Sequence, residues 1–180
     1  MVGRVTERLF VALSLAPEIR MAIDAWRLEL ALPGRPVPAG NLHVTLRFIG
    51  DVDEVGRDRV LALLDQTETP DPFVMHIGDV GAFPNPSKAT VAWASVDAGR
   101  PLAQLAEAVD DAVAGAGFGY EDRPFHPHLT LSRIRPPRDL SQVDAAHRPG
   151  VKIEVDRFVL YRSRFGPDGV RYEGVEQFLL

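Results

Sequence analysis

One four-residue pattern occurs twice in this chain, once in each half. Residues His43 to Leu46 form His-Val-Thr-Leu, and residues His128 to Leu131 form His-Leu-Thr-Leu. With five histidines and six threonines in 180 residues, chance predicts only about 0.16 His-x-Thr tripeptides. Two copies that share an apolar middle residue and a following leucine therefore indicate a duplicated unit.

The apolar pattern around the two copies supports this duplication. Leu13 precedes His43 by 30 residues, and Val96 precedes His128 by 32. Each copy is expected to follow a strand, a helix and a loop rich in glycine or proline. The predicted order is strand 8–15, helix 16–30, loop 33–40 and strand 41–49, then strand 90–96, helix 101–116, a glycine-rich stop at 115–119 and a strand around 128–134. A helix over 53–66 and strands near 73–80, 151–160 and 170–179, the last two joined by a turn at 166–169, complete a duplicated α+β chain that forms one domain over residues 1–180.

Composition narrows the chemistry that the chain can perform. It has no cysteine, which excludes thiolate metal sites, disulfides and cysteine nucleophiles. The net charge of −5 argues against a protein that coats long nucleic acids, but residues 119–171 carry nine Arg and one Lys against seven Asp and Glu, a local excess of +3. A local anion site is allowed. No apolar run approaches the roughly 18 residues of a membrane span, so a cytoplasmic location is expected.

The repeated pattern suits phosphate chemistry. On a strand, side chains alternate, so His43 and Thr45 share one face, as do His128 and Thr130, while the apolar residues between them point to the core. Two imidazoles with ordinary pKa values near about 6.5 can act as base and acid close to neutral pH. One would deprotonate water and the other would protonate a departing sugar oxygen, without a metal or a cofactor. The threonine hydroxyls can donate hydrogen bonds to phosphate oxygens.

The chain resembles the two-histidine phosphoesterases, and more narrowly the RNA 2′,3′-cyclic phosphodiesterases, also called 2′-5′ RNA ligases. The resemblance lies in both His-x-Thr-Leu segments, in Asn41-Leu42 before the first, and in the residues Arg123-Pro124-Phe125-His126-Pro127 before the second. It extends from Arg8-Leu9-Phe10 to the Tyr161-Arg162-Ser163 and Tyr172 region.

The resemblance implies two pseudo-symmetric lobes, each with an antiparallel sheet, flanking a central cleft, with the helices outside. It also implies hydrolysis of the cyclic phosphate ends of RNA to 2′-phosphates, and the same groups could ligate a 5′-hydroxyl end. For the oligomeric state, a monomer is the default expectation. His43 would be the acid that protonates O3′, His128 the base that activates water, and Thr45 and Thr130 the phosphate-binding residues. The near symmetry of the halves also permits the opposite acid and base roles.

The resemblance further suggests Phe48 as a stacking surface for the terminal base and Arg133 as a phosphate or nucleotide contact. Each lies five residues after its motif histidine. Simple alternation places both on the face opposite the histidines, so a strand bend or bulge must turn them. The alternatives are a core aromatic for Phe48 and a solvated surface residue for Arg133.

Three alternatives remain open from the sequence. His126 and His128, with His43 as a third ligand, could form a metal site, although Pro127 does not favour a regular chelating strand. The chain could be a nucleotide-binding module without activity. It could also act on a small cyclic nucleotide, because the same four residues would serve any cyclic phosphodiester. His76 and His147 match no motif.

Overall fold

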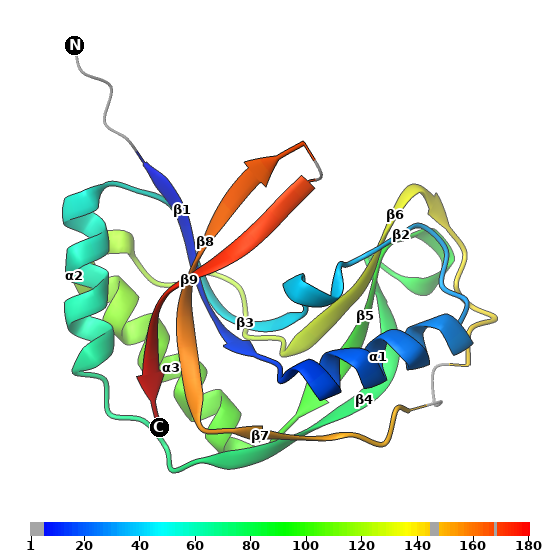
Figure 1. Cartoon of the computed structure of the whole chain (residues 1–180), viewed down its shortest axis with the longest axis horizontal. Helices are drawn as coiled ribbons and strands as arrows, with labels where there is room; N and C mark the ends of the chain where they lie inside the picture. The colour runs from blue at the N-terminus through cyan, green and yellow to red at the C-terminus, as the bar shows by residue number, and fades with distance from the viewer. Residues whose placement is uncertain (1–5, 145–147, 168) are drawn as a thin grey trace.

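The structure is a computed structural model that describes residues 6–144, 148–167 and 169–180 (Figure 1). His147 lies outside the described residues. The helices are α1 (Pro17–Glu29), α2 (Glu54–Asp65) and α3 (Arg100–Val113). The strands are β1 (Glu7–Ser14), β2 (Arg35–Pro36), β3 (His43–Val52), β4 (Phe73–Phe83), β5 (Ala89–Asp97), β6 (His128–Arg138), β7 (Lys152–Val155), β8 (Arg157–Gly166) and β9 (Gly169–Leu179). The predicted α+β class is confirmed, and within the described ranges no helix is long and apolar enough to cross a membrane.

The strands form one curled antiparallel sheet. Its order is β7-β4-β5-β6-β3-β1-β8-β9, and the short β2 pairs with β6. The two predicted sheets are the halves β7-β4-β5-β6 and β3-β1-β8-β9, which diverge in Figure 1. They are joined by pairing between β3 and β6 at Val44 and Leu129. The two motif strands therefore lie next to each other at the centre of the sheet.

The helices cross between the two halves. Helix α3 follows β5 but packs against β3 and α2, and it buries Leu105 and Val109 in that contact. Helix α1 follows β1 but runs across the other half of the sheet (Figure 1). There, Arg27 donates hydrogen bonds to the carbonyl oxygens of Val37 at 2.6 Å and Leu131 at 3.2 Å. Because α1 and α3 each pack on the half of the sheet opposite to the strand that they follow, they hold the two halves of the chain together.

Strand β3 has a β-bulge at Leu46. The residues on either side of it, Thr45 and Arg47, pair with consecutive residues of β1. A bulge of this kind breaks the strict alternation of side chains. Leu46 and Arg47 are accordingly both buried.

Strand β6 has a bulge at the equivalent position, Leu131. Thr130 and Ser132 pair with consecutive residues of β5, and Leu131 and Ser132 are both buried. Because each bulge shifts the alternation by one residue, Phe48 and Arg133 are exposed rather than turned into the core. The bulge expected from the sequence is therefore confirmed in both halves.

The prediction of one strand over residues 151–160 is wrong. The segment forms two strands that separate at Asp156, with β7 paired to β4 and β8 paired to β1, in opposite halves of the sheet. The sequence carries a signal for this break. The alternation of buried Ile153 and Val155 is followed by a step of three residues to buried Phe158, which puts the two pieces out of phase.

Candidate active site

The motif histidines lie close together on neighbouring strands. The residue pair that joins β3 to β6 comes one position after each histidine. In an antiparallel ladder this register sets His43 beside Thr130 and Thr45 beside His128. The predicted grouping of two histidines and two threonines is thus present as a four-residue cluster at the junction of the two halves.

Backbone carbonyls orient both imidazoles in the same way. His43 Nδ1 lies 2.7 Å from the carbonyl oxygen of Asn41, and His128 Nδ1 lies 2.7 Å from that of His126. A carbonyl oxygen can only accept a hydrogen bond, so each Nδ1 carries a hydrogen. In the neutral rings, Nε2 is then the nitrogen that carries no hydrogen.

His43 is held as a neutral imidazole. Its pKa is lowered from 6.5 to about 4: burial is the largest cause, the hydrogen bond with the Asn41 backbone acts in the opposite direction, and the nearby charges of His128 and Arg133 add to the lowering. Phe10 and Tyr172 enclose the ring, with centroids 5.0 and 5.1 Å away. In the free protein at neutral pH, the His43 imidazole is therefore uncharged.

NMR titration of the imidazole protons tests this assignment. In the free protein, His43 is expected to stay neutral as the pH falls through 6.5 and to protonate only near pH 4. Binding of a nucleoside 3′-phosphate adds negative charge beside the ring and is expected to raise the pKa of His43. A free-protein pKa of 6.5 or above would contradict the burial argument.

The two threonines lie within reach of the same space. Thr45 Oγ1 is 3.0 Å from His43 Nε2. Because Nε2 carries no hydrogen in the neutral tautomer, the Thr45 hydroxyl donates this bond in the free protein. Thr130 is half-buried in the equivalent place on β6. An anion that enters the site can take over the Thr45 hydrogen bond and release His43 Nε2.

Phe48 and Arg133 flank this cluster. The Phe48 side chain is 39% exposed, so it is not a core aromatic. The Arg8 guanidinium lies 5.0 Å from the Phe48 ring centroid, within cation–π range. Arg133 is exposed, and its charge contributes to the lowered pKa of His43, which places it near that ring.

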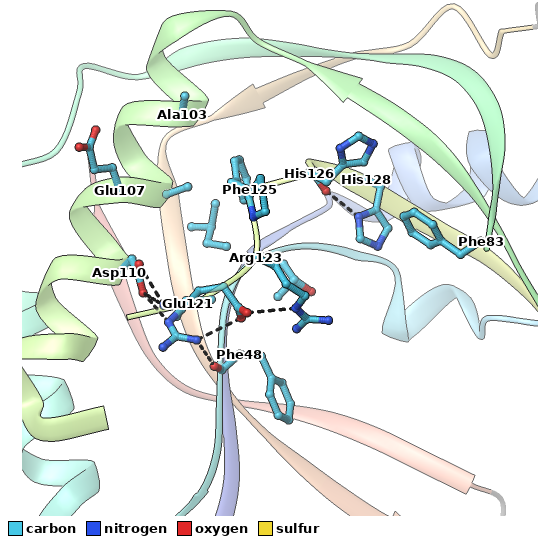
Figure 2. Close-up of a pocket in the computed structure, with 15 residues that line it drawn as sticks. Phe48, Phe83, Ala103, Glu107, Asp110, Glu121, Arg123, Phe125, His126 and His128 are labelled. Carbon is cyan, nitrogen blue, oxygen red and sulfur yellow. Dashed lines mark hydrogen bonds and ion pairs between the residues drawn. The ribbon is translucent and has the colours of Figure 1, made fainter. Parts of the chain in front are cut away.

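A cleft of about 690 Å³ opens beside His128 and Thr45, and His43 is not among its lining residues. Figure 2 shows its wall on one side formed by α3 and on the other by the segment that leads into β6. The lining combines apolar, aromatic and charged side chains: Thr45, Leu46, Arg47, Phe48, Phe83, Ala103, Ala106, Glu107, Asp110, Glu121, Arg123, Pro124, Phe125, His126 and His128. A volume of this size can hold a nucleotide.

Arg47 ties the wall of the cleft together. Its side chain is 8% exposed, and Nε lies 2.6 Å from Asp110 Oδ1 on α3. One terminal nitrogen bonds Glu121 Oε2 at 3.2 Å and the carbonyl oxygen of Phe48 at 2.8 Å, while the other bonds the carbonyl oxygen of Gly119 at 2.8 Å. Arg47 thus fastens β3, α3 and the segment before β6 to one another. Arg47 is not among the site residues predicted from the sequence.

Aromatic rings support His128. Phe83 and Trp93 lie 5.4 and 6.1 Å from its ring, and Trp93 lies 5.7 Å from the ring of His126. Trp93 packs directly over Gly81, where a Cβ atom would overlap the indole. The position of Trp93 therefore depends on a glycine at position 81. The packing of Trp93 against the His128 ring depends on the same glycine.

Replacement of Gly81 by alanine is expected to displace Trp93. The overpacking should lower the free energy of unfolding by about 1–3 kcal/mol and reduce activity through His128. Urea unfolding and steady-state kinetics measure the two effects. The control is Gly40→Ala, since a Cβ at Gly40 meets nothing within 4 Å. Equal stability of the two variants would contradict the packing argument.

The metal-site alternative finds no support among the residues that the structure describes. No group of three or more His, Asp or Glu side chains there could hold a metal ion. His126 instead packs edge-on against Phe83 and Trp93, and its carbonyl oxygen orients His128. His126 is therefore a residue that positions its neighbour.

Comparison with known proteins identifies the family. A model of the 2′-5′ RNA ligase superfamily matches residues 15–166. The chain belongs to this superfamily. Within it, the chain is 35% identical over 179 residues to the RNA 2′,3′-cyclic phosphodiesterase of Escherichia coli, covering 97% of each chain. It is 33% identical to the protein of the same name from Thermus thermophilus, covering 96% of this chain and 90% of that one.

Solved structures of superfamily members share the fold. Apo E. coli LigT superposes with a TM-score of 0.81 at 33% identity, covering 97% of this chain and 98% of that one. LigT has also been crystallised with 3′-AMP, and that structure gives the same TM-score of 0.81. The bilobal α+β architecture predicted from the sequence is therefore that of this enzyme superfamily.

Proposed function

We propose that this chain hydrolyses RNA 2′,3′-cyclic phosphate ends to 2′-phosphates, with His43 and His128 as the proton-transfer residues. The observation that carries the proposal is the cluster at the β3–β6 junction, where two histidines with fixed Nδ1 partners present Nε2 beside two threonine hydroxyls. The names of its superfamily relatives, RNA 2′,3′-cyclic phosphodiesterases, point to the same substrate.

The reaction needs one base and one acid. His128 Nε2 takes a proton from water, whose oxygen attacks phosphorus. The bond from phosphorus to O3′ breaks, and His43 Nε2 gives its proton to O3′, which leaves the phosphate on O2′. Thr45 and Thr130 donate hydrogen bonds to the non-bridging oxygens, where negative charge grows in the transition state, and Arg133 adds a positive charge beside them.

The low pKa of His43 in the free protein bears on these roles. An acid must hold a proton, whereas burial lowers the pKa of His43 to about 4. The bound phosphate anion offsets this effect, because its charge favours the imidazolium and it competes for the Thr45 hydroxyl. His43 therefore becomes an acid only when substrate is present.

The same atoms support a 2′-5′ ligation. If the 5′-hydroxyl of a second RNA replaces water, its oxygen attacks phosphorus, the bond to O3′ breaks, and the product is a 2′-5′ phosphodiester. No nucleotide cofactor is consumed, because the cyclic phosphate itself supplies the leaving group. The superfamily takes its name from this activity.

Phe48 suits the terminal base. It is an exposed aromatic ring that lines the cleft and has the Arg8 guanidinium over it. Stacking of a base on an aromatic ring contributes about 1–3 kcal/mol and tolerates any base. We therefore assign Phe48 to binding of the last nucleoside.

A panel of RNA ends tests the proposal. The protein is incubated with the same oligomer that ends in a cyclic phosphate, a 3′-phosphate, a 2′-phosphate or a 3′-hydroxyl. Only the cyclic phosphate should be consumed. Binding of this end without turnover would favour the binding-module alternative, and loss of the 3′-phosphate would indicate a phosphatase instead.

Three expectations from the sequence stay predictions. These are a cytoplasmic location, a monomeric state and a single domain over residues 1–180. Cell fractionation, size-exclusion chromatography with light scattering, and the cooperativity of unfolding check them in turn.

A further inference from the structure

An ion-pair chain leads from the core of the protein to the mouth of the cleft. Arg47 lies at its buried end and binds Glu121 Oε2 at 3.2 Å. The other oxygen of the same carboxylate, Oε1, binds Arg123 Nε at 3.1 Å. The backbone nitrogen of Glu121 is also held, at 3.2 Å from Asp110 Oδ1. Glu121 is thus fixed on three sides and in turn fixes Arg123.

Arg123 is exposed but oriented. Its side chain is 83% exposed, and its contact with Glu121 uses only Nε. Among the described residues, its two terminal amino groups make no hydrogen bond or ion pair. Figure 2 shows the guanidinium directed toward the side of the cleft where Phe48 and His128 lie. Two parallel N–H donors in this state match two oxygens of a phosphate group.

The wall of the cleft beside Arg123 is apolar and acidic. It carries Ala103 and Ala106 and the carboxylates of Glu107, Asp110 and Glu121, and Arg47 is paired with the last two of these carboxylates. This part of the cleft suits an uncharged base or sugar. Of the two arginines that line the cleft, Arg47 has both terminal nitrogens bonded to the protein, whereas Arg123 at the mouth is bonded only through Nε among the described residues.

The cyclic phosphate cannot be the group that Arg123 binds, because the proposed function places it between the motif histidines and threonines. When the base stacks on Phe48, the next anion along an RNA chain is the phosphodiester at the 5′ oxygen of the last nucleoside. A cyclic mononucleoside lacks this group. An enzyme that binds this phosphodiester would therefore prefer an RNA end to a small cyclic nucleotide.

We propose that Arg123 binds the phosphodiester that joins the last two nucleotides of the substrate, and so makes the enzyme prefer RNA ends to cyclic mononucleosides. The inference rests on the proposed function. Arg123 determines specificity, and Glu121 and Arg47 position it.

A matched set of substrates tests this role. Adenosine 2′,3′-cyclic phosphate, its 5′-phosphorylated form and the dinucleotide ApA with a cyclic end share the reacting group and differ at the 5′ oxygen. We compare kcat/KM for the three in wild type, Arg123→Gln and Arg123→Lys. The control variant is Arg157→Gln, an exposed arginine of β8 that bonds Asp156 and Gln177 and does not belong to the cleft lining.

The ratio of kcat/KM for the dinucleotide to that for the mononucleoside is the readout. Arg123→Gln should lower this ratio by about 10- to 100-fold, chiefly through KM, as expected for loss of a charge-assisted contact. For Arg123→Lys the ratio should lie between those of Arg123→Gln and wild type, and for Arg157→Gln it should equal the wild-type ratio. For the dinucleotide, the slope of log KM against the logarithm of the salt concentration should be smaller by about 0.7 in Arg123→Gln than in wild type, as expected for the loss of one phosphate contact.

Other outcomes would overturn the proposal. An unchanged ratio, whether both substrates slow equally or neither slows, means that Arg123 does not contact the 5′ phosphodiester. If wild type turns over none of the three substrates, the proposed function itself fails, and that result is distinct from an unchanged ratio in an active enzyme.

Discussion

Alanine in place of either His43 or His128 is expected to lower kcat/KM for a cyclic-phosphate RNA end by about 10²- to 10⁴-fold. Each variant removes one proton-transfer atom, and neither histidine can replace the other because each Nδ1 is fixed to its own carbonyl oxygen. Steady-state kinetics at neutral pH measure the loss.

His76→Ala is the matched control for this experiment. His76 is an exposed histidine on β4 and lies outside the cleft lining. Its replacement should leave kcat/KM unchanged. If His43→Ala or His128→Ala kept more than about a third of wild-type activity, that residue would have no proton-transfer role.

Replacement of Arg47 by methionine is expected to produce the largest loss of stability. Methionine fills a similar volume but leaves the partly buried carboxylates of Asp110 and Glu121 without their shared cation. Removal of one partner of a fully buried pair costs about 3–5 kcal/mol, and the partial exposure of these carboxylates lowers the expected loss to about 2–4 kcal/mol. Activity should fall as well, since Arg47 also holds the carbonyl oxygen of Phe48.

Two further variants separate charge from packing. Asp110→Asn in the Arg47→Met background removes one unpaired carboxylate and should recover part of the lost stability. Arg157→Met breaks an exposed pair with Asp156 and should change the free energy of unfolding by less than about 1 kcal/mol. Urea unfolding measures all three. A loss for Arg47→Met no larger than for Arg157→Met would contradict the anchoring role.

The motif cluster could be predicted because it depends on short-range patterns. Alternation within a strand places His43 and Thr45 on one face, and the repeat of strand, helix and loop predicts an equivalent strand for His128. The need for a bulge also followed from spacing, since Phe48 and Arg133 lie an odd number of residues after their histidines. The structure has these bulges at Leu46 and Leu131.

The Arg47 network could not be predicted, because its partners come from separate elements. Asp110 lies on α3 and Glu121 in the segment before β6, and the sequence does not show that α3 crosses to pack on β3. A charged residue directly after Leu46, at a position that the bulge turns inward, was the available signal. Local periodicity predicts which face of an element is buried and the order of the elements. Which half of the sheet a helix packs on depends on tertiary contacts, which local periodicity does not predict.

The most direct test of the central claim is ³¹P NMR of a short RNA with a 2′,3′-cyclic phosphate end, incubated with the wild-type protein in excess EDTA. We predict that the cyclic phosphate signal disappears and that a single 2′-phosphate monoester signal replaces it. A 3′-phosphate product, an unchanged cyclic phosphate, or turnover that appears only after a divalent metal ion is added would contradict hydrolysis by the two histidines.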